Sequence, residues 1–236
     1  MLCYPPNPVL QASRWPERNY DSIRRVAATN AGLVDLWEAS PIRLETNAPR
    51  TAEIIDTLFP GDPLLCCGWT RHRFDTRPKS RWYKLDDLQF IVPSPMTEKQ
   101  GVTKKGNRSA HSLSTTSPRR FLVVEFDFDG NRSTAEANLL AAGERNAADL
   151  CAGLLLQLAA RAPLVLAVHS GVKSLHGWFY CAGRAEESLR RFMNYAVSLG
   201  ADDATWMRSQ FVRMPDGRRD NDKRQTIYFF NPAVVK

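Results

Sequence analysis

The sequence predicts an α+β fold in one unit spanning residues 1–236. Three observations lead to this prediction. Residues 21–37 carry apolar side chains at helical spacing, residues 119–130 and 163–169 are apolar runs typical of buried strands, and the pair Ser170-Gly171 favours a tight turn into another strand. No long linker interrupts the 236 residues, and 43% hydrophobic composition is enough to bury a core. We expect two lobes that meet near residue 118, an N-terminal lobe of about 1–117 and a C-terminal lobe of about 118–236.

The N-terminal lobe is predicted to contain two helices and two strands. The first helix covers residues 21–37, although Gly32 weakens its end, and the second covers residues 51–59, where "FPGDP" stops it. The strands are "LLCCGW" and "LQFIVPSPM", the second ended by its prolines. Residues 71–84 are basic and are expected to be irregular.

A long polar loop is expected at residues 97–117, "TEKQGVTKKGNRSAHSLSTTS". Loops of about twenty residues are usually either functional or disordered. Lys104, Lys105 and Arg108 are therefore candidates for contacts with a phosphate backbone. The alternative is a disordered surface segment.

The C-terminal lobe is predicted to mix strands and helices. The strand at 119–130 is followed by a helix over 134–161, a strand over 163–169 and, after the turn, a strand over 172–181. A helix over 184–199 is closed by Gly200. A basic stretch and a last strand, "QTIYFF", follow.

The chain is basic, with 32 Lys and Arg residues against 25 Asp and Glu, a net charge of +7. Such a surplus favours a polyanionic partner, although many basic proteins have none. The five cysteines form no C-x-x-C pair and no zinc-finger spacing with the four histidines, so we expect reduced thiols and no zinc. The sequence shows neither a signal-peptide pattern nor an apolar stretch of membrane-spanning length, so we expect a soluble, cytoplasmic protein without a membrane partner.

The segment "FLVVEFDFD" places two carboxylates on one side of a strand. Alternate residues share a face, so Leu122 and Val124 face a core, while Glu125 and Asp127 face the other way, about 6.6 Å apart at about 3.3 Å per residue. Their repulsion is about 0.6 kcal/mol in water and about 2.5 kcal/mol at an effective dielectric constant of about 20. On a solvated face the pair needs no explanation. In a cleft it needs a cation, and carboxylate oxygens suit Mg²⁺ or Mn²⁺.

Polar residues also interrupt the strand "VKSLHGWFYC". Ser174 and His176 share a face, and a hydroxyl and an imidazole both donate to phosphate oxygens. Gly177 has no side chain and lets a ligand come close. Lys173 is expected to reach round the start of the strand as a positive charge for phosphate. The alternative is a half-buried strand with a polar patch and a surface lysine.

A third segment, "DDATWMRSQFVRMPDGRRDNDKRQ", combines two aspartates with many basic residues. Asp202 and Asp203 follow Gly200. The basic residues are Arg208, Arg213, Arg218, Arg219, Lys223 and Arg224. The segment is either a solvated basic loop or a surface for nucleic acid, in which the last four cations contact the backbone and give affinity without sequence choice.

Taken in this order, the three segments resemble the archaeo-eukaryotic primase superfamily, and most of all the primase–polymerase domains of plasmids, phages and mobile elements. The residues that carry the resemblance are "VVEFD", "HSGVKSLHGWF" and "ADDATWMRSQFVRMPDGRR", within about residues 89–232. The resemblance implies a lobe related to an RNA-recognition-motif sheet, packed on an α/β N-terminal lobe, with the active site in the cleft between them.

The same resemblance implies a role for each site residue. Glu125 and Asp127 match two metal ligands, and Asp202 a third. Ser174 and His176 match the motif that holds the phosphates of the incoming nucleotide, and Arg213 matches the basic residue that follows the third motif. By their charge and hydrogen-bond donors, Lys173, His176 and Arg213 would then stabilise the charge that develops on the phosphates. If residues 202–206 begin a strand, Asp202 and Asp203 point to opposite faces, so only one of them reaches the metals.

The function implied is a template-dependent nucleotidyltransferase, a DNA primase or polymerase. It would add NTP or dNTP units to a 3′-hydroxyl with two Mg²⁺ or Mn²⁺ ions. Its partners would be a single-stranded DNA template and primer, and a helicase on another chain, in a bacterial, plasmid or phage context. Glu125 departs from the family pattern, which has Asp there, and no zinc module is recognisable. The alternatives are a catalytically idle nucleic-acid-binding replication protein and a metal-dependent nuclease.

Overall fold

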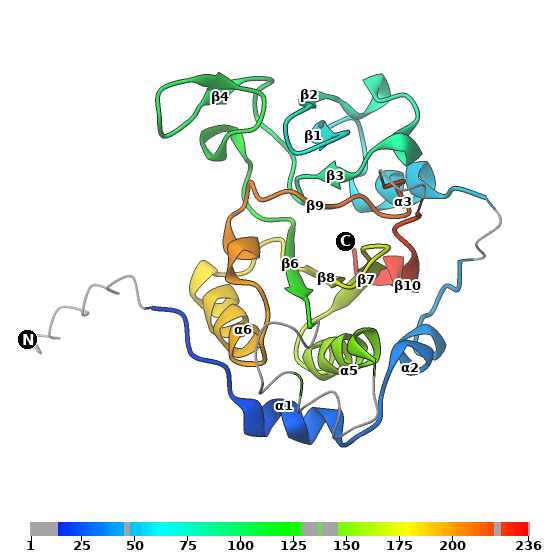
Figure 1. Cartoon of the computed structure of the whole chain (residues 1–236). Helices are drawn as coiled ribbons and strands as arrows, with labels where there is room; N and C mark the ends of the chain where they lie inside the picture. The colour runs from blue at the N-terminus through cyan, green and yellow to red at the C-terminus, as the bar shows by residue number, and fades with distance from the viewer. Residues whose placement is uncertain (1–13, 45–47, 129–136, 138–145, 220–222, 236) are drawn as a thin grey trace, which may run out of the picture.

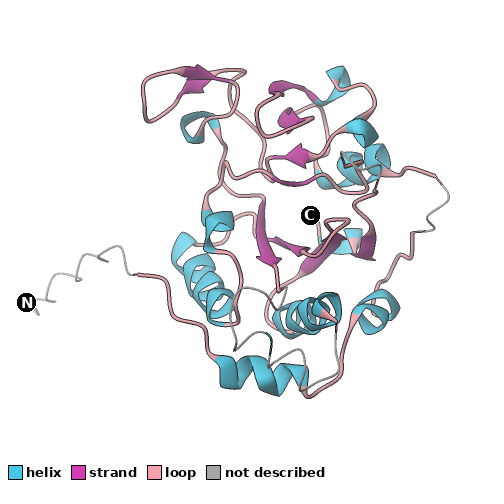
Figure 2. Ribbon diagram, viewed as in Figure 1, coloured by secondary structure: helices cyan, strands magenta, loops and turns pink. Residues whose placement is uncertain are grey.

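The computed structural model describes residues 14–44, 48–128, 137, 146–219 and 223–235. The protein is an α+β fold with antiparallel sheets, as the sequence predicts (Figures 1 and 2). Among the residues described, no helix is both long enough and apolar enough to cross a membrane. Short 3₁₀ turns link the main elements at Lys79–Arg81, Leu85–Asp87, Leu113–Thr115, Asp203–Trp206 and Pro232–Val234.

One sheet, here called the C-terminal sheet, is built from the strands that the sequence identifies most clearly. Its order is β10-β7-β8-β6, with every neighbouring pair antiparallel. The bounds are Phe121–Phe126 for β6, Leu164–His169 for β7, Leu175–Tyr180 for β8 and Ile227–Phe230 for β10. Along the chain the elements follow the order β6-α5-β7-β8-α6-β10. Strand β8 therefore lies between β6 and β7, as in a split β-α-β unit.

Four helices lie on one side of this sheet: α5 and α6 pack on its strands, α2 contacts α5 and β10, and α1 packs on α5 (Figure 1). They are α1, Tyr20–Ala27; α2, Leu33–Glu38; α5, Ala147–Ala159; and α6, Glu186–Ser198. Leu122, Val124 and Phe126 of β6 pack into the same core as these helices. The helix predicted over 134–161 is not continuous, because Asn146 has an extended backbone and caps α5, which begins at Ala147. Most of residues 134–145 lie outside the described residues.

The prediction of one helix over 21–37 is wrong, because the chain breaks between α1 and α2. Asn30 has a φ of 58°, a left-handed conformation that ends a helix. The break is fixed by α5: the Leu33 amide donates to Asp149 Oδ1 at 2.9 Å, and a side chain on Gly32 would meet the same carboxylate at 2.6 Å. The contact joins residues 116 positions apart, so the local sequence does not reveal it.

The other face of the C-terminal sheet packs against a second one, here called the N-terminal sheet, with the order β2-β1-β3-β9. Its strands are β1, Leu64–Gly68; β2, Phe74–Pro78; β3, Phe90–Ile91; and β9, Val212–Arg213. Helix α3, Thr51–Leu58, shares its core. Phe121 and Val123 of β6 reach this core, so both faces of β6 are buried. Residues 71–84 are not irregular throughout, since β2 pairs with β1 over five residues.

Residues 97–117 hold a small hairpin rather than the unstructured loop that the sequence predicts. Strand β4, Gly101–Val102, pairs with β5, Arg108–Ser109, and the hydroxyl of Ser112 donates to the Val102 carbonyl. Figure 1 shows this hairpin at the far end of the molecule from α1 and α5.

Two segments lie across the division that the sequence predicts near residue 118. Helices α1 and α2 precede that point but pack on α5 and on the C-terminal sheet. Strand β9 follows it but pairs with β3 of the N-terminal sheet. Both segments therefore connect the two halves of the sequence.

Candidate active site

The register of β6 and β8 brings the first two sequence motifs together. Glu125 lies directly opposite His176, and Val123 opposite Trp178. Since Val123 and Trp178 pack between the two sheets, Glu125 and His176 face the same side. The alternation predicted for this strand is thus confirmed, with Leu122 and Val124 in the opposite, helix-covered core.

His176 is the residue around which the predicted site gathers. It is 2% exposed, its Nε2 lies 3.3 Å from Ser174 Oγ and 3.5 Å from Glu125 Oε1, and its Nδ1 has no hydrogen-bond partner among the described residues. Burial lowers the pKa of His176, and Arg213 lowers it further, against the opposite effects of the carboxylates of Glu125, Asp127 and Asp202. The imidazole is therefore neutral near pH 7 and surrounded by charges of both signs.

Lys173 lies in the turn before β8, not in the strand. The turn spans Ser170 to Ser174: the Ser170 amide donates to the Ser174 carbonyl, and the Ser174 amide to Ser170 Oγ. Gly171 has a φ of 81°, which favours glycine. From this turn Lys173 Nζ reaches to 3.4 Å from Asp127 Oδ1. The Lys173 side chain therefore extends round the start of β8, as predicted, and it contacts the carboxylate of Asp127.

The third motif joins the cluster through its backbone. The Asp202 amide donates to the carbonyl of Glu125 at 2.9 Å, so the end of β6 fixes the position of Asp202. Residues 202–206 do not begin a strand. Asp202 caps a 3₁₀ turn, Asp203–Trp206, and its Oδ1 accepts from the Ala204 amide. The expectation of opposite faces for Asp202 and Asp203 therefore fails, and both line one cavity.

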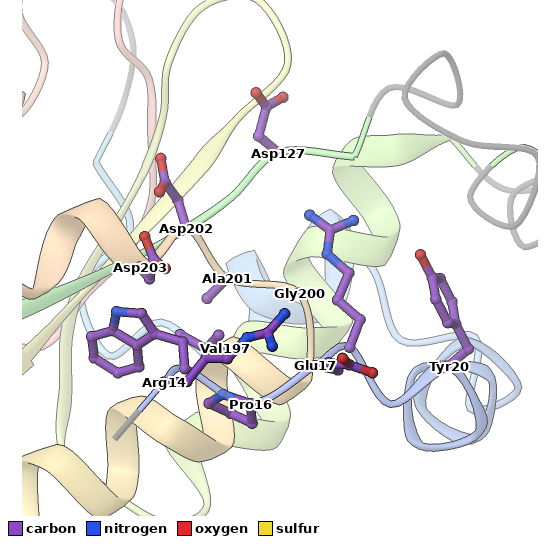
Figure 3. A pocket seen from close by; sticks show the side chains of 12 residues that line it. Arg14, Pro16, Glu17, Tyr20, Asp127, Val197, Gly200, Ala201, Asp202 and Asp203 are labelled. Atoms are coloured by element: carbon purple, nitrogen blue, oxygen red, sulfur yellow. The ribbon is translucent and has the colours of Figure 1, made fainter. Parts of the chain in front are cut away.

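That cavity, of about 730 Å³, lies beside the carboxylates. Figure 3 shows Asp127, Asp202 and Asp203 on one side and the chain from Arg14 to Tyr20 on the other. The sequence analysis missed this N-terminal segment. The local indication is its composition, "RWPERNY", which places aromatic and charged residues on both sides of Pro16.

Gly177 does not serve the approach of a ligand, contrary to the sequence prediction. A Cβ on Gly177 would lie 2.5 Å from Leu155 Cδ2 of α5, on the helix-covered face of the sheet. The glycine faces away from Glu125 and His176, its absent side chain leaving room for the helix.

The basic residues divide into three groups. Arg213, in β9, lies over the ring of Phe90 at 4.8 Å and acts electrostatically on His176, so it belongs to the cluster. The hairpin that contains Arg218, Arg219, Lys223 and Arg224 packs on the turn with Lys173, where Arg219 Nη1 donates to the Ser170 carbonyl at 2.8 Å. Lys104, Lys105 and Arg108 belong to the β4–β5 hairpin, which Figure 1 shows apart from β6 and β8.

The carboxylates do not form a closed metal cage. Within the described ranges, no group of three or more His, Cys, Asp or Glu side chains is spaced to hold a metal ion. Their chemistry nevertheless fits a hard cation, and Mg²⁺ usually binds one or two carboxylates and keeps several waters. No protein-family model, curated protein or solved structure matches the chain.

Proposed function

We propose that the protein is a template-dependent nucleotidyltransferase that adds NTP or dNTP units to a 3′-hydroxyl, resembling the archaeo-eukaryotic primases. The observation that carries this proposal is the convergence on His176 of three segments far apart in sequence. Glu125, Asp127, Ser174 and Asp202 come from the three motifs, and Arg213 joins them from the other sheet.

The arrangement supplies the two kinds of group that the reaction needs. Carboxylate oxygens are suited to divalent cations, and Lys173 and Arg213 are cations suited to phosphate. Mg²⁺ or Mn²⁺ held by Glu125, Asp127 and Asp202 would activate the 3′-hydroxyl and neutralise the leaving pyrophosphate.

The protein side chains would bind and orient the triphosphate. Ser174 Oγ has a hydroxyl to donate to a phosphate oxygen, and the neutral imidazole of His176 carries one N–H donor. Lys173 would exchange its contact with Asp127 for the phosphate, since a metal at Asp127 takes over the neutralisation of that carboxylate. The charge that develops on the phosphates is then opposed by Lys173 and Arg213.

The order of the elements also supports the proposal. The split β-α-β unit formed by β6, α5, β7 and β8 agrees with the lobe that the resemblance implies. Strand β10 departs from that lobe, because it pairs with β7, whereas the last strand of an RNA-recognition-motif sheet pairs with the first. The second sheet, packed on the face that carries Glu125 and His176, supplies Arg213, whose charge acts on His176. The basic hairpin next to Lys173 is well placed to track a template backbone.

Single-turnover nucleotide addition tests the proposal. Glu125→Gln and Asp127→Asn each remove a charge at nearly constant size, and each is expected to slow addition by about 100-fold or more, as the loss of other charge-stabilising groups does. Glu187→Gln, on the exposed surface of α6, is the matched control and should extend primers normally. Unfolding temperature and DNA affinity should be unchanged in all three. Wild-type rates in Glu125→Gln and Asp127→Asn would refute the assignment.

A metal-dependent nuclease would use the same groups, because carboxylates, imidazole and lysine also suit phosphodiester cleavage. The assay separates the two activities, since a nuclease shortens the labelled strand without a triphosphate. An idle nucleic-acid-binding relative would bind the strand and change its length in neither direction.

A further inference from the structure

The cavity beside the carboxylates has two chemically different walls. Asp127, Asp202 and Asp203 form one wall, and the segment 14–20 supplies the other (Figure 3). The charged residues of that segment that line the cavity are Arg14, Glu17 and Arg18, a net charge of +1, and the Arg18 guanidinium lies 5.5 Å from the centre of the Phe128 ring. At about 730 Å³, it falls within the range of about 300–1,000 Å³ that is typical of ligand sites. A cavity that is acidic on one side and basic on the other favours a ligand with a matching polarity.

The segment 14–20 is held firmly enough to act as a wall. Trp15 packs edge-on against Trp206 at 5.9 Å, and the guanidinium of Arg190 lies 3.4 Å from the centre of its ring. Trp206 is covered in turn by Arg119 at 4.2 Å. The Asn19 amide donates to the Ser198 carbonyl at 2.7 Å, which fixes the other end of the segment to α6.

The cavity lies next to the proposed triphosphate site without including it. Asp127 and Asp202 line it, but Lys173, Ser174, His176 and Arg213 do not. In phosphoryl and nucleotidyl transfer, the attacking and leaving oxygens lie roughly in line on opposite sides of the phosphorus. If the triphosphate lies against Lys173 and His176, the attacking strand has to reach the aspartates from another side, and this cavity offers such an approach.

We propose that this cavity binds the 3′-terminal nucleotide of the primer strand, an inference that rests on the proposed function. The 3′-hydroxyl points to Asp127 and Asp202, and the backbone phosphate of that nucleotide points to Arg14 and Arg18. The polarity of the cavity fits this ligand, because a strand end carries a neutral hydroxyl at one end and a phosphodiester at the other. The triphosphate is assigned to the other side of the aspartates, because Lys173, Ser174, His176 and Arg213 do not line this cavity.

Binding of primed and unprimed DNA tests the inference without any catalysis. The probe is a primer–template with 2-aminopurine as the 3′-terminal primer base, and the comparison is the same template without primer. The double variant Arg14→Gln with Arg18→Gln should weaken primed DNA by at least about tenfold relative to unprimed DNA, the loss of one charge-assisted hydrogen bond. The affinity for triphosphate should stay unchanged.

The matched control is Arg24→Gln with Arg25→Gln, which removes two charges from the exposed side of α1 outside the cavity. It corrects for general loss of electrostatic attraction to DNA. Trp15→Ala removes the ring that holds the segment 14–20 against Trp206 and Arg190, so it should produce the same selective loss of affinity for primed DNA. Trp15→Phe keeps an aromatic ring and should retain most of that affinity. Unfolding temperatures identify any variant that fails to fold, in which case the remaining pair decides.

Three results would overturn the inference: equal loss for primed and unprimed DNA, loss of triphosphate affinity alone, or no loss at all. The proposed function fails separately. If the wild type binds primer ends through Arg14 and Arg18 but never extends them, nucleotidyl transfer is wrong and the strand-end site stands. If the wild type extends primers and the double variant binds primed DNA normally, nucleotidyl transfer stands and the strand-end site is wrong.

Discussion

Gly177→Ala is expected to destabilise the protein without affecting the proposed triphosphate site. Gly177 lies in the centre of β8, opposite Val124, with its absent side chain directed at α5. An added Cβ would lie 2.5 Å from Leu155 Cδ2 and 3.3 Å from Leu155 Cδ1, so the buried leucine has to move. The substitution therefore displaces Leu155 of α5 on the helix-covered face of the sheet, not the residues around His176 on the opposite face.

The magnitude follows from two opposing effects. Overpacking a buried site costs about 1–3 kcal/mol, while replacing a strand glycine by alanine returns about 0.5–1 kcal/mol of backbone entropy. The expected net loss is at most about 2.5 kcal/mol, which corresponds to a fall of up to about 10 °C in the unfolding temperature for a chain of this size. Leu155→Ala alone leaves a cavity and should cost about 2–5 kcal/mol.

Urea unfolding of the four proteins in this double-mutant cycle measures the effect. In the Leu155→Ala background both leucine methyl groups near the new Cβ are gone, and Phe179 Cε2 at 3.1 Å is the tight contact that remains. Gly177→Ala should therefore cost much less in this background than in the wild type. A coupling energy of about 1–3 kcal/mol follows. The same cost in both backgrounds, or normal stability with a loss of triphosphate affinity, would show that Gly177 faces the ligand after all.

Three further predictions concern the third ligand, a buried histidine and the basic hairpins. Asp202→Asn should slow nucleotide addition by about 100-fold or more, and Asp203→Asn far less, because the Glu125 carbonyl fixes Asp202 beside β6; the opposite order in a Mg²⁺ titration would make Asp203 the ligand. Burial lowers the pKa of His111, which stacks on Phe211, so the folded state binds its proton less readily than the unfolded state. The resulting stability is present above about pH 6.5 and is lost as the pH falls; a His111 titration by NMR at or above that value would contradict this. Replacing Arg218, Arg219, Lys223 and Arg224 with glutamine should reduce the salt dependence of single-strand binding more than replacing Lys104, Lys105 and Arg108. The reason is that the first group adjoins the site through the contact of Arg219 with Ser170. Equal slopes of affinity against salt concentration in the two variants would contradict this.

Strong local patterns predicted the elements on which the site is built. Strands β6, β7 and β8 carry long apolar runs, and α3 and α6 show helical spacing with clear ends. The alternation along β6 was enough to separate Leu122 and Val124 from Glu125. The three polar motifs could be expected to meet only through a resemblance, because their convergence depends on strand order.

The remaining features depend on contacts distant in sequence. The break before α2 requires Asp149, and the glycine at 177 requires Leu155. Strand β9 is two residues long and has no periodicity to detect. The 3₁₀ turn after Asp202 replaces the expected strand because that carboxylate caps its own backbone. The segment 14–20 gains its place from Trp15, whose partners lie on α6 and at Trp206.

The central claim is most directly tested by single-nucleotide addition with the wild-type protein. A labelled primer on a template with one defined next base is incubated with Mg²⁺ or Mn²⁺ and each of the eight NTPs and dNTPs in turn. The account predicts a primer longer by one nucleotide with the complementary base alone, and no product when the triphosphate is omitted. A strand that shortens without triphosphate, or one that stays unchanged while the protein binds it, would contradict nucleotidyl transfer at this site.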